Sequence, residues 1–159
     1  MQAKVCGLST TKQVETCVEY GADFCGFILN YKKSHRFISY KVAEQLTKID
    51  KKKTTYVGVF VDPTIEELKT FSKLDLDYFQ IYGNFSNDEI IQFKEETQKK
   101  IIMALQIKRE QDVLQYKSYE KDNEIYFQYN PTKEKIKKVI KKTNIKDSPF
   151  KVLKNINFN

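Results

Sequence analysis

Residues 55–71 read TYVGVFVDPTIEELKTF, and this stretch decides the fold. Its first seven residues are rich in β-branched and aromatic side chains, which predicts a β-strand over residues 55–61. Thr64 and Glu67 have the spacing of a capping box, in which a hydroxyl and the side chain three residues later satisfy backbone donors at a helix start. The apolar residues that follow recur on one helical face: Ile65, Leu68 and Phe71. One strand followed by one amphipathic helix is therefore predicted.

The same pattern recurs along the whole chain. We expect strands over residues 3–6, 24–29, 55–61, 78–81, 101–105 and 125–127. Amphipathic stretches lie between them, and in each of them these residues fall on one helical face: Val14, Cys17 and Val18, then Val42, Leu46 and Ile49, then Ile90, Phe93 and Thr97. Two more capping boxes mark helix starts, at Thr10 with Gln13 and at Ser86 with Glu89.

Alternating strands and helices predict a parallel sheet, because parallel neighbours need a crossover connection. Six βα units fit either an open doubly wound sheet or an incomplete (β/α)₈ barrel, and composition alone does not separate them. A complete barrel needs roughly 200–250 residues, so about two units are lacking from this chain. We expect residues 1–130 to form a partial β/α barrel domain and residues 131–159 a basic helical or irregular tail.

The basic charge of the chain belongs to its tail. The formal net charge is +7, and residues 131–159 contain nine lysines against Glu134 and Asp147, which leaves 19 basic and 19 acidic groups in residues 1–130. We expect a solvated amphipathic helix there rather than a nucleic-acid-binding surface, because no aromatic platform accompanies the lysines.

No apolar run approaches the ~20 residues that cross a bilayer, and the first residues lack a secretory signal pattern. A cytoplasmic location without membrane contact is expected. The three cysteines, Cys6, Cys17 and Cys25, lack metal-type spacing, so we expect reduced thiols and no metal site. Cys17 and Cys25 fall within apolar patterns and are interpreted as core residues.

Ligands of parallel β/α folds bind at the carboxyl ends of the strands. The expected strands lead there into Cys6 and Gly7, Arg36, Gln80 and Tyr82, and Gln128. We predict that Cys6, Arg36 and Gln80 surround one pocket at these ends, with Gln128 on its far wall. From the residues alone, an inert buried thiol remains the alternative for Cys6.

Five short strings of this sequence resemble the phosphoribosylanthranilate isomerases, which are TIM-type (β/α) barrel enzymes of tryptophan biosynthesis. They occur in the family's order and spacing: KVCGL at 4–8, EYGAD at 19–23, SHRFIS at 34–39, VGVFVDP at 57–63 and QIYG at 80–83. The resemblance covers about residues 3–128. It favours the incomplete barrel over the doubly wound sheet.

The resemblance implies an aldose–ketose isomerase of aromatic amino acid biosynthesis that works without a cofactor. Its reaction is the Amadori rearrangement of N-(5-phosphoribosyl)anthranilate to 1-(2-carboxyphenylamino)-1-deoxyribulose 5-phosphate. An acid opens the ribose ring, and a base removes the proton from C2. By resemblance, Cys6 is the base and Arg36 holds the anthranilate carboxylate. Four further residues are implied in binding the phosphorylated substrate: Lys4, Gly7, Gln80 and Tyr82.

Two departures from the family pattern lower the expected activity. Gln128 stands where the family has the aspartate that acts as general acid, and an amide releases no proton at relevant pH. The glycine-rich phosphate loop has no counterpart, since no glycine follows Gly83. The C-terminal part is therefore interpreted as divergent or truncated, and we expect a poor isomerase or none.

Other functions stay open at this point. The main alternative is a non-catalytic truncated barrel fragment or a phosphate- or anion-binding module, and a nucleic-acid-binding protein is a distant third. A sixth strand without a further neighbour would leave an open edge through which copies of the chain can self-associate.

Overall fold

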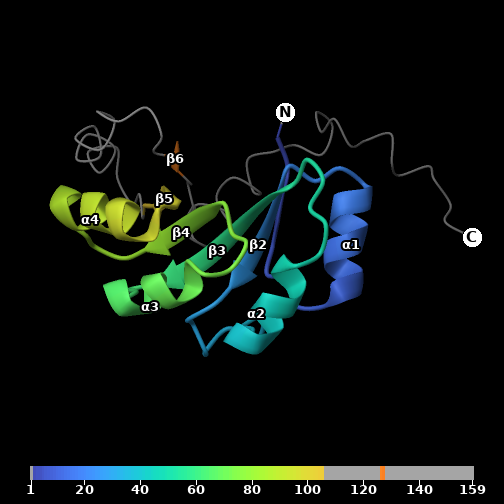
Figure 1. Cartoon of the computed structure of the whole chain (residues 1–159), viewed down its shortest axis with the longest axis horizontal. Helices are drawn as coiled ribbons and strands as arrows, with labels where there is room; N and C mark the ends of the chain where they lie inside the picture. The colour runs from blue at the N-terminus through green and yellow to red at the C-terminus, as the bar shows by residue number, and fades with distance from the viewer. Residues whose placement is uncertain (1, 106–125, 128–159) are drawn as a thin grey trace, which may run out of the picture.

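The computed structural model describes residues 2–105 and 126–127 (Figure 1). Their elements are β1 (Lys4–Cys6), α1 (Thr11–Glu19), β2 (Phe24–Ile28), α2 (Tyr40–Thr47), β3 (Thr55–Val61), α3 (Ile65–Phe71), β4 (Tyr78–Tyr82), α4 (Asn87–Thr97), β5 (Lys100–Ala104) and β6 (Tyr126–Phe127). Within these residues, no helix is long and apolar enough to span a membrane.

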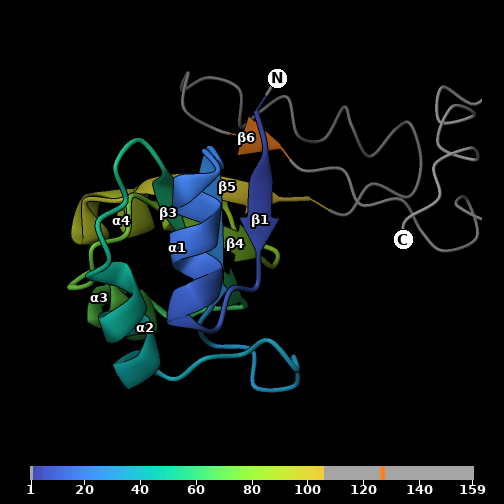
Figure 2. The same cartoon turned by 90° about the vertical axis from the view of Figure 1, so that its right-hand side faces the viewer.

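The strands form one parallel sheet in the order β1-β2-β3-β4-β5-β6. All four helices lie on one side of this curved sheet, as Figures 1 and 2 show from two directions. In the described part of the chain, β1 and β6 are the two edges, so the sheet is not closed there. The predicted fold class, an incomplete TIM-type barrel of parallel βα units, is confirmed. The division between a barrel domain and a tail at residue 130 stays a prediction, because the tail lies outside the described residues.

The hydrophobic core fills the space between the sheet and the helices. Successive strand residues point to opposite faces. In the central strands β2, β3 and β4, the large side chains on the helix side are completely buried: Phe27, Tyr56, Phe60, Phe79 and Ile81. The rings of Phe60 and Phe79 pack edge to face with their centroids 4.9 Å apart. The residues between them in sequence point to the inner, concave face of the sheet.

The local signals at the helix starts are confirmed. Capping boxes are formed at Thr10 with Gln13, at Thr64 with Glu67 and at Ser86 with Glu89. The fourth helix, α2, begins after Ser39, whose hydroxyl accepts from the backbone N–H of Val42 without a reciprocal partner. These caps fix where each helix starts, and so they fix the lengths of the loops at the carboxyl ends of the strands.

The strand ends agree with the predicted ones or differ from them by one residue. β4 continues to Tyr82 and β5 runs from Lys100 to Ala104, because these strands pair from Tyr78 with Lys100 through to Tyr82 with Ala104. Pairing between neighbours therefore sets the strand ends, rather than the local sequence.

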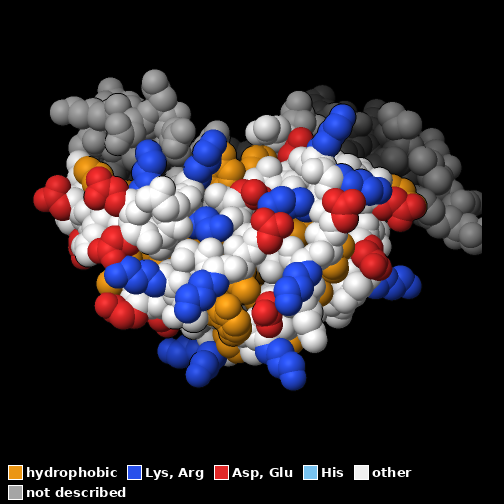
Figure 3. Space-filling view, viewed as in Figure 1, with side chains coloured by type: hydrophobic (Ala, Val, Ile, Leu, Met, Phe, Trp, Pro, Cys, Tyr) orange, Lys and Arg blue, Asp and Glu red, His pale blue; other side chains and the backbone are white. Residues whose placement is uncertain are grey.

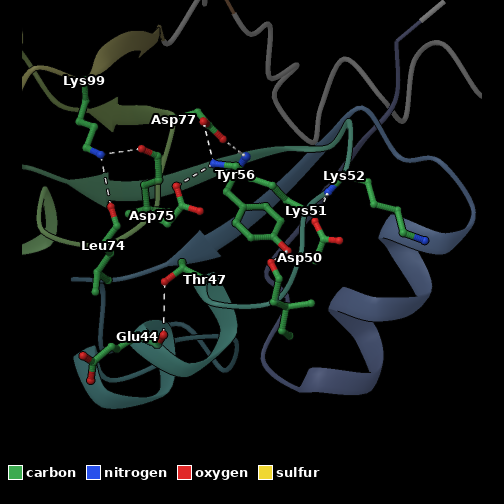
Figure 4. A network of polar contacts seen from close by, with 12 residues as sticks. Glu44, Thr47, Asp50, Lys51, Lys52, Tyr56, Leu74, Asp75, Asp77 and Lys99 are labelled. Atoms are coloured by element: carbon green, nitrogen blue, oxygen red, sulfur yellow. Dashed lines mark hydrogen bonds and ion pairs between the residues drawn. The ribbon is translucent and has the colours of Figure 1, made fainter.

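A polar network ties β3 to β4 at the amino ends of the strands (Figure 4). Lys51 Nζ lies 2.8 Å from Asp75 Oδ1 and 2.9 Å from Asp77 Oδ1. Burial alone would lower the pKa of Lys51, but the hydrogen bonds to Asp75 and Asp77 outweigh it and the pKa is raised. The other carboxylate oxygen of Asp77 accepts from the Tyr56 backbone N–H at 2.7 Å. This network lies at the end of the sheet opposite the carboxyl ends.

Figure 3 shows basic and acidic side chains interspersed over one face of the molecule. This mixture agrees with the balance of charges in residues 1–130.

Candidate active site

The inner face of the sheet carries a cavity of about 340 Å³. Its walls come from four strands and the residue segment before β1: Gln2, Lys4, Cys6, Phe24, Gln80, Tyr82 and Ile102. The two-residue alternation of strands explains this set, because Lys4 and Cys6 in β1 and Gln80 and Tyr82 in β4 share one face. The structure therefore brings four of the predicted site residues into one cavity.

A chain of hydrogen bonds crosses the cavity from β1 to β4. The Lys4 ammonium donates to Gln80 Oε1, and Gln80 Nε2 donates to the Tyr82 hydroxyl at 3.0 Å. Gln80 is only 2% exposed, and its amide suits the position because it offers one acceptor and one donor group. Burial lowers the pKa of Lys4 from its ordinary 10.5, and the neighbouring Cys6 opposes this shift. Lys4 as a whole residue is exposed, so the desolvation concerns the ammonium end that is bonded to the buried Gln80.

The absence of a side chain on Gly26 leaves space for the side chains of Cys6 and Lys4. It pairs with Cys6 across the β1–β2 ladder, and a Cβ added to it would lie 2.8 Å from Cys6 Sγ and 3.2 Å from Lys4 Cε. Every other residue type would displace the thiol. Sequence analysis did not single out Gly26 as a site residue, although a glycine inside a β-rich run is itself a sign of close approach by a neighbouring group.

Gly7 and Arg36 lie together at the carboxyl end of β1. Gly7 has φ +84°, and a Cβ there would stand 2.6 Å from Arg36 Cδ. Arg36 Nη1 donates to the Cys6 backbone carbonyl at 2.9 Å. Arg36 is therefore close to Cys6 but is not among the residues that line the cavity.

This placement differs from the predicted pocket in two ways. Arg36 touches the backbone beside the cavity rather than its wall, because its guanidinium is bonded to a main-chain carbonyl. The cavity also reaches toward the amino ends of the strands, since Lys4 and Phe24 are the first residues of β1 and β2. Gln128 lies outside the described residues, so its predicted position on the far wall stays a prediction.

Asp62 and Gly83 form a tight contact at the carboxyl ends of β3 and β4. Asp62 has φ +44°, a left-handed conformation that is uncommon outside glycine, and its N–H donates to the Tyr82 carbonyl at 2.7 Å. A Cβ on Gly83 would lie 2.6 Å from Asp62 Oδ1. The strained residue thus lies next to Tyr82 of the cavity, and such strain clusters at functional sites.

Cys17 and Cys25 lie away from this cavity. Cys25 is completely buried on the helix side, and Cys17 is half-buried on α1. Burial raises the pKa of Cys25 to about 12, and a hydrogen bond with Cys17 contributes in the same direction. No group of three or more potential metal ligands occurs within the described part of the chain.

A curved parallel sheet with helices outside and a cavity on its inner face defines a protein of the β/α-barrel class. The family model described as "N-(5'phosphoribosyl)anthranilate (PRA) isomerase" matches residues 3–128. The chain belongs to this family.

Two curated relatives illustrate the match. The N-(5'-phosphoribosyl)anthranilate isomerase of Streptococcus mutans is 39% identical over 118 residues, which cover 74% of this chain and 58% of that protein. The isomerase of Zymomonas mobilis is 36% identical over 120 residues, which cover 75% of this chain and 56% of that protein. The chain therefore spans about half the length of the curated relatives it matches.

Solved structures agree on the fold. Phosphoribosyl anthranilate isomerase from Thermotoga maritima matches with a TM-score of 0.73 and 25% identity, covering 84% of this chain and 63% of that one. A second isomerase structure, in complex with reduced 1-(o-carboxyphenylamino)-1-deoxyribulose 5-phosphate, matches with a TM-score of 0.71 and 22% identity. It covers 92% of this chain and 78% of the other.

Proposed function

We propose that this chain binds N-(5'-phosphoribosyl)anthranilate on the inner face of its sheet and catalyses the Amadori rearrangement at a low rate. One observation carries the proposal: the Cys6 thiol shares a cavity with the Lys4 ammonium and the Gln80 amide, in a chain that belongs to the isomerase family. Membership of the family supports the reaction, and the cavity supports the location.

Cys6 is the proposed base. Once the ribose ring opens and C1 forms a Schiff base with the anthranilate nitrogen, the thiolate takes the proton from C2. The electron pair of the C2–H bond then forms the enolamine, which rearranges to the ketose product. Hydrogen moves only within the substrate and the acid–base groups, so this sequence requires no cofactor.

Arg36 is the proposed group for the anthranilate carboxylate. A guanidinium has five N–H donors, and one N–H of Arg36 Nη1 donates to the Cys6 carbonyl. The remaining N–H groups can donate two parallel hydrogen bonds to a carboxylate. The bond to the Cys6 carbonyl holds these N–H groups beside the thiol. Lys4, Gly7, Gln80 and Tyr82 are proposed to shape the rest of the substrate site.

Gln128 is the reason to propose a low rate. Opening the ribose ring needs a proton on the ring oxygen, and a general acid typically contributes ~10²–10⁴ in rate. An amide can hydrogen-bond to that oxygen but cannot protonate it. The same residue favours a second candidate function, a module that binds the phosphorylated ligand without converting it.

A fluorescence assay of phosphoribosylanthranilate consumption tests the proposal, with Cys6→Ala and Gln128→Asp variants. We expect slow turnover in the parent chain, none in Cys6→Ala, and a gain in Gln128→Asp. A parallel titration with the reduced product analogue measures binding alone. Binding without turnover in all three proteins would support the binding module, and absence of both would refute the proposal.

A further inference from the structure

Cys6 and Lys4 meet over Gly26. Because an added Cβ on Gly26 would lie 2.8 Å from Cys6 Sγ and 3.2 Å from Lys4 Cε, these two atoms are at most about 6 Å apart, the sum of the two distances. An opposite charge within about 4–6 Å favours the charged form of an ionisable group. The positive charge is on Nζ, one C–N bond of about 1.5 Å beyond Cε, so it lies at most about 7.5 Å from Cys6 Sγ, and Cys6 acts on the pKa of Lys4.

Gln80 fixes the end of the lysine side chain. A free lysine samples many rotamers, and holding it in one costs conformational entropy. Here the buried Gln80 accepts a hydrogen bond from Lys4 Nζ, while the Tyr82 hydroxyl holds the opposite side of the Gln80 amide. An ammonium has three N–H donors, so two stay available to face the thiolate or a ligand.

Other charged groups near Cys6 are less well placed to act on its sulfur. The Arg36 guanidinium is bonded to the Cys6 backbone carbonyl. Lys12 lines a separate hollow between α1 and β1 that Cys6 also borders. Lys100 of β5 lies over the Tyr78 ring, 5.6 Å from its centroid. Lys4 is the cation among the residues that line the inner cavity with Cys6.

We propose that Lys4 is the positioning residue that stabilises the thiolate of Cys6, and that Gly26 and Gln80 hold the two groups together for this purpose. The proposal deepens the proposed function, because it rests on Cys6 being the base and names the cation that shares the cavity with its sulfur. Proton removal from the substrate then turns an ammonium–thiolate pair into an ammonium beside a neutral thiol.

The test is the rate at which iodoacetamide alkylates Cys6 at neutral pH, followed by mass spectrometry of its peptide. Cys17 in the same molecule is the internal reference for the Lys4 variants, because it lies on α1 outside the inner cavity. Cys17 lines the same hollow as Lys12, so the Lys12→Met rate is compared with that of the parent protein. In general, an opposite charge within about 4–6 Å changes the acidity of an ionisable group about 10- to 1,000-fold. In an alkylation rate, roughly half of such a gain, on a logarithmic scale, is offset because a more acidic thiol is a weaker nucleophile. We therefore expect Lys4→Met to slow Cys6 alkylation about 3- to 30-fold.

Control variants separate charge from structure. Lys4→Arg keeps the charge and should restore most of the rate, whereas a packing role alone would not be rescued in this way. Lys12→Met removes a lysine from the other hollow beside Cys6 and should leave the rate unchanged. The preference of Cys6 for anionic iodoacetate over iodoacetamide should fall in Lys4→Met, because the attracting charge is lost.

Gly26→Ala and Gln80→Leu test the two holding residues, and both should slow Cys6 relative to Cys17. An unchanged Cys6 rate in Lys4→Met, or an equal loss in Lys12→Met, would overturn the proposal. If Arg36→Gln slowed Cys6 alkylation and Lys4→Met did not, the proposal would be overturned, and the Arg36 guanidinium would be the cation that acts on Cys6. These rates require no substrate, so a chain that alkylates as expected but shows no turnover would refute the proposed function alone.

Discussion

Removing the Asp77 carboxylate should destabilise the fold far more than removing its neighbour Asp75, although both pair with Lys51 (Figure 4). Asp77 also accepts a hydrogen bond from the backbone N–H of Tyr56, a residue that is completely buried. Asp77→Ala leaves that N–H without its partner and deprives Lys51 of one carboxylate. Asp75 has a side chain that is 63% exposed, and within the described residues it is bonded to Lys51 alone.

The magnitudes follow from these contacts. A hydrogen bond to a charged group contributes about 1.5–3 kcal/mol, and an exposed ion pair adds about 0–1 kcal/mol. We therefore expect Asp77→Ala to lower the free energy of unfolding by about 2–4 kcal/mol and Asp75→Ala by less than about 1 kcal/mol.

Urea unfolding followed by circular dichroism measures both losses, since the midpoint and slope give the free energy of unfolding. Asp77→Asn is the intermediate case, because its amide oxygen can still accept from Tyr56 while the charge is lost. Equal losses for Asp75→Ala and Asp77→Ala would refute the assignment of the larger effect to the backbone hydrogen bond.

Two further predictions use the pKa shifts. Burial raises the pKa of Cys25 to about 12, so Cys25 should resist alkylation in the folded protein at neutral pH and react only after unfolding; labelling at the rate of Cys17 would contradict its burial. Because burial lowers the pKa of Lys4 below 10.5, the unfolded chain binds more protons than the folded one between that lowered pKa and 10.5. The free energy of unfolding of the parent protein should therefore rise with pH through this window, relative to that of Lys4→Met. Urea unfolding of both proteins at a series of pH values measures this difference. A difference that does not change with pH would refute the lowered pKa of Lys4.

The elements that could be predicted from sequence are those whose signals are local. Thr64 and Glu67 lie within one helical turn, so the pattern that predicts the capping box is also the structure that forms it. The β3 strand has the predicted bounds because every residue in it except Gly58 is β-branched or aromatic. Alternation of such units was enough to predict the parallel sheet.

The arrangement inside the cavity depends on contacts between distant segments. Gly26 provides room for Cys6 only because the register places the two residues opposite each other, and no pattern within either strand specifies that register. Lys4 and Gln80 are 76 residues apart and meet through the curvature of the sheet. The resemblance predicted these residues as members of one site but not the bonds between them.

The strand that carries Cys6 and Lys4 is also a weakly anchored one. β1 has three residues, and within the described residues it pairs with β2 alone, whereas β3 and β4 are paired on both sides. Amide hydrogens of such an edge exchange through local opening, at a smaller free-energy cost than those of central strands. A ligand that bridges Cys6 on β1 and Gln80 on β4 would have to suppress this opening, so part of its binding energy would appear as slower exchange along β1.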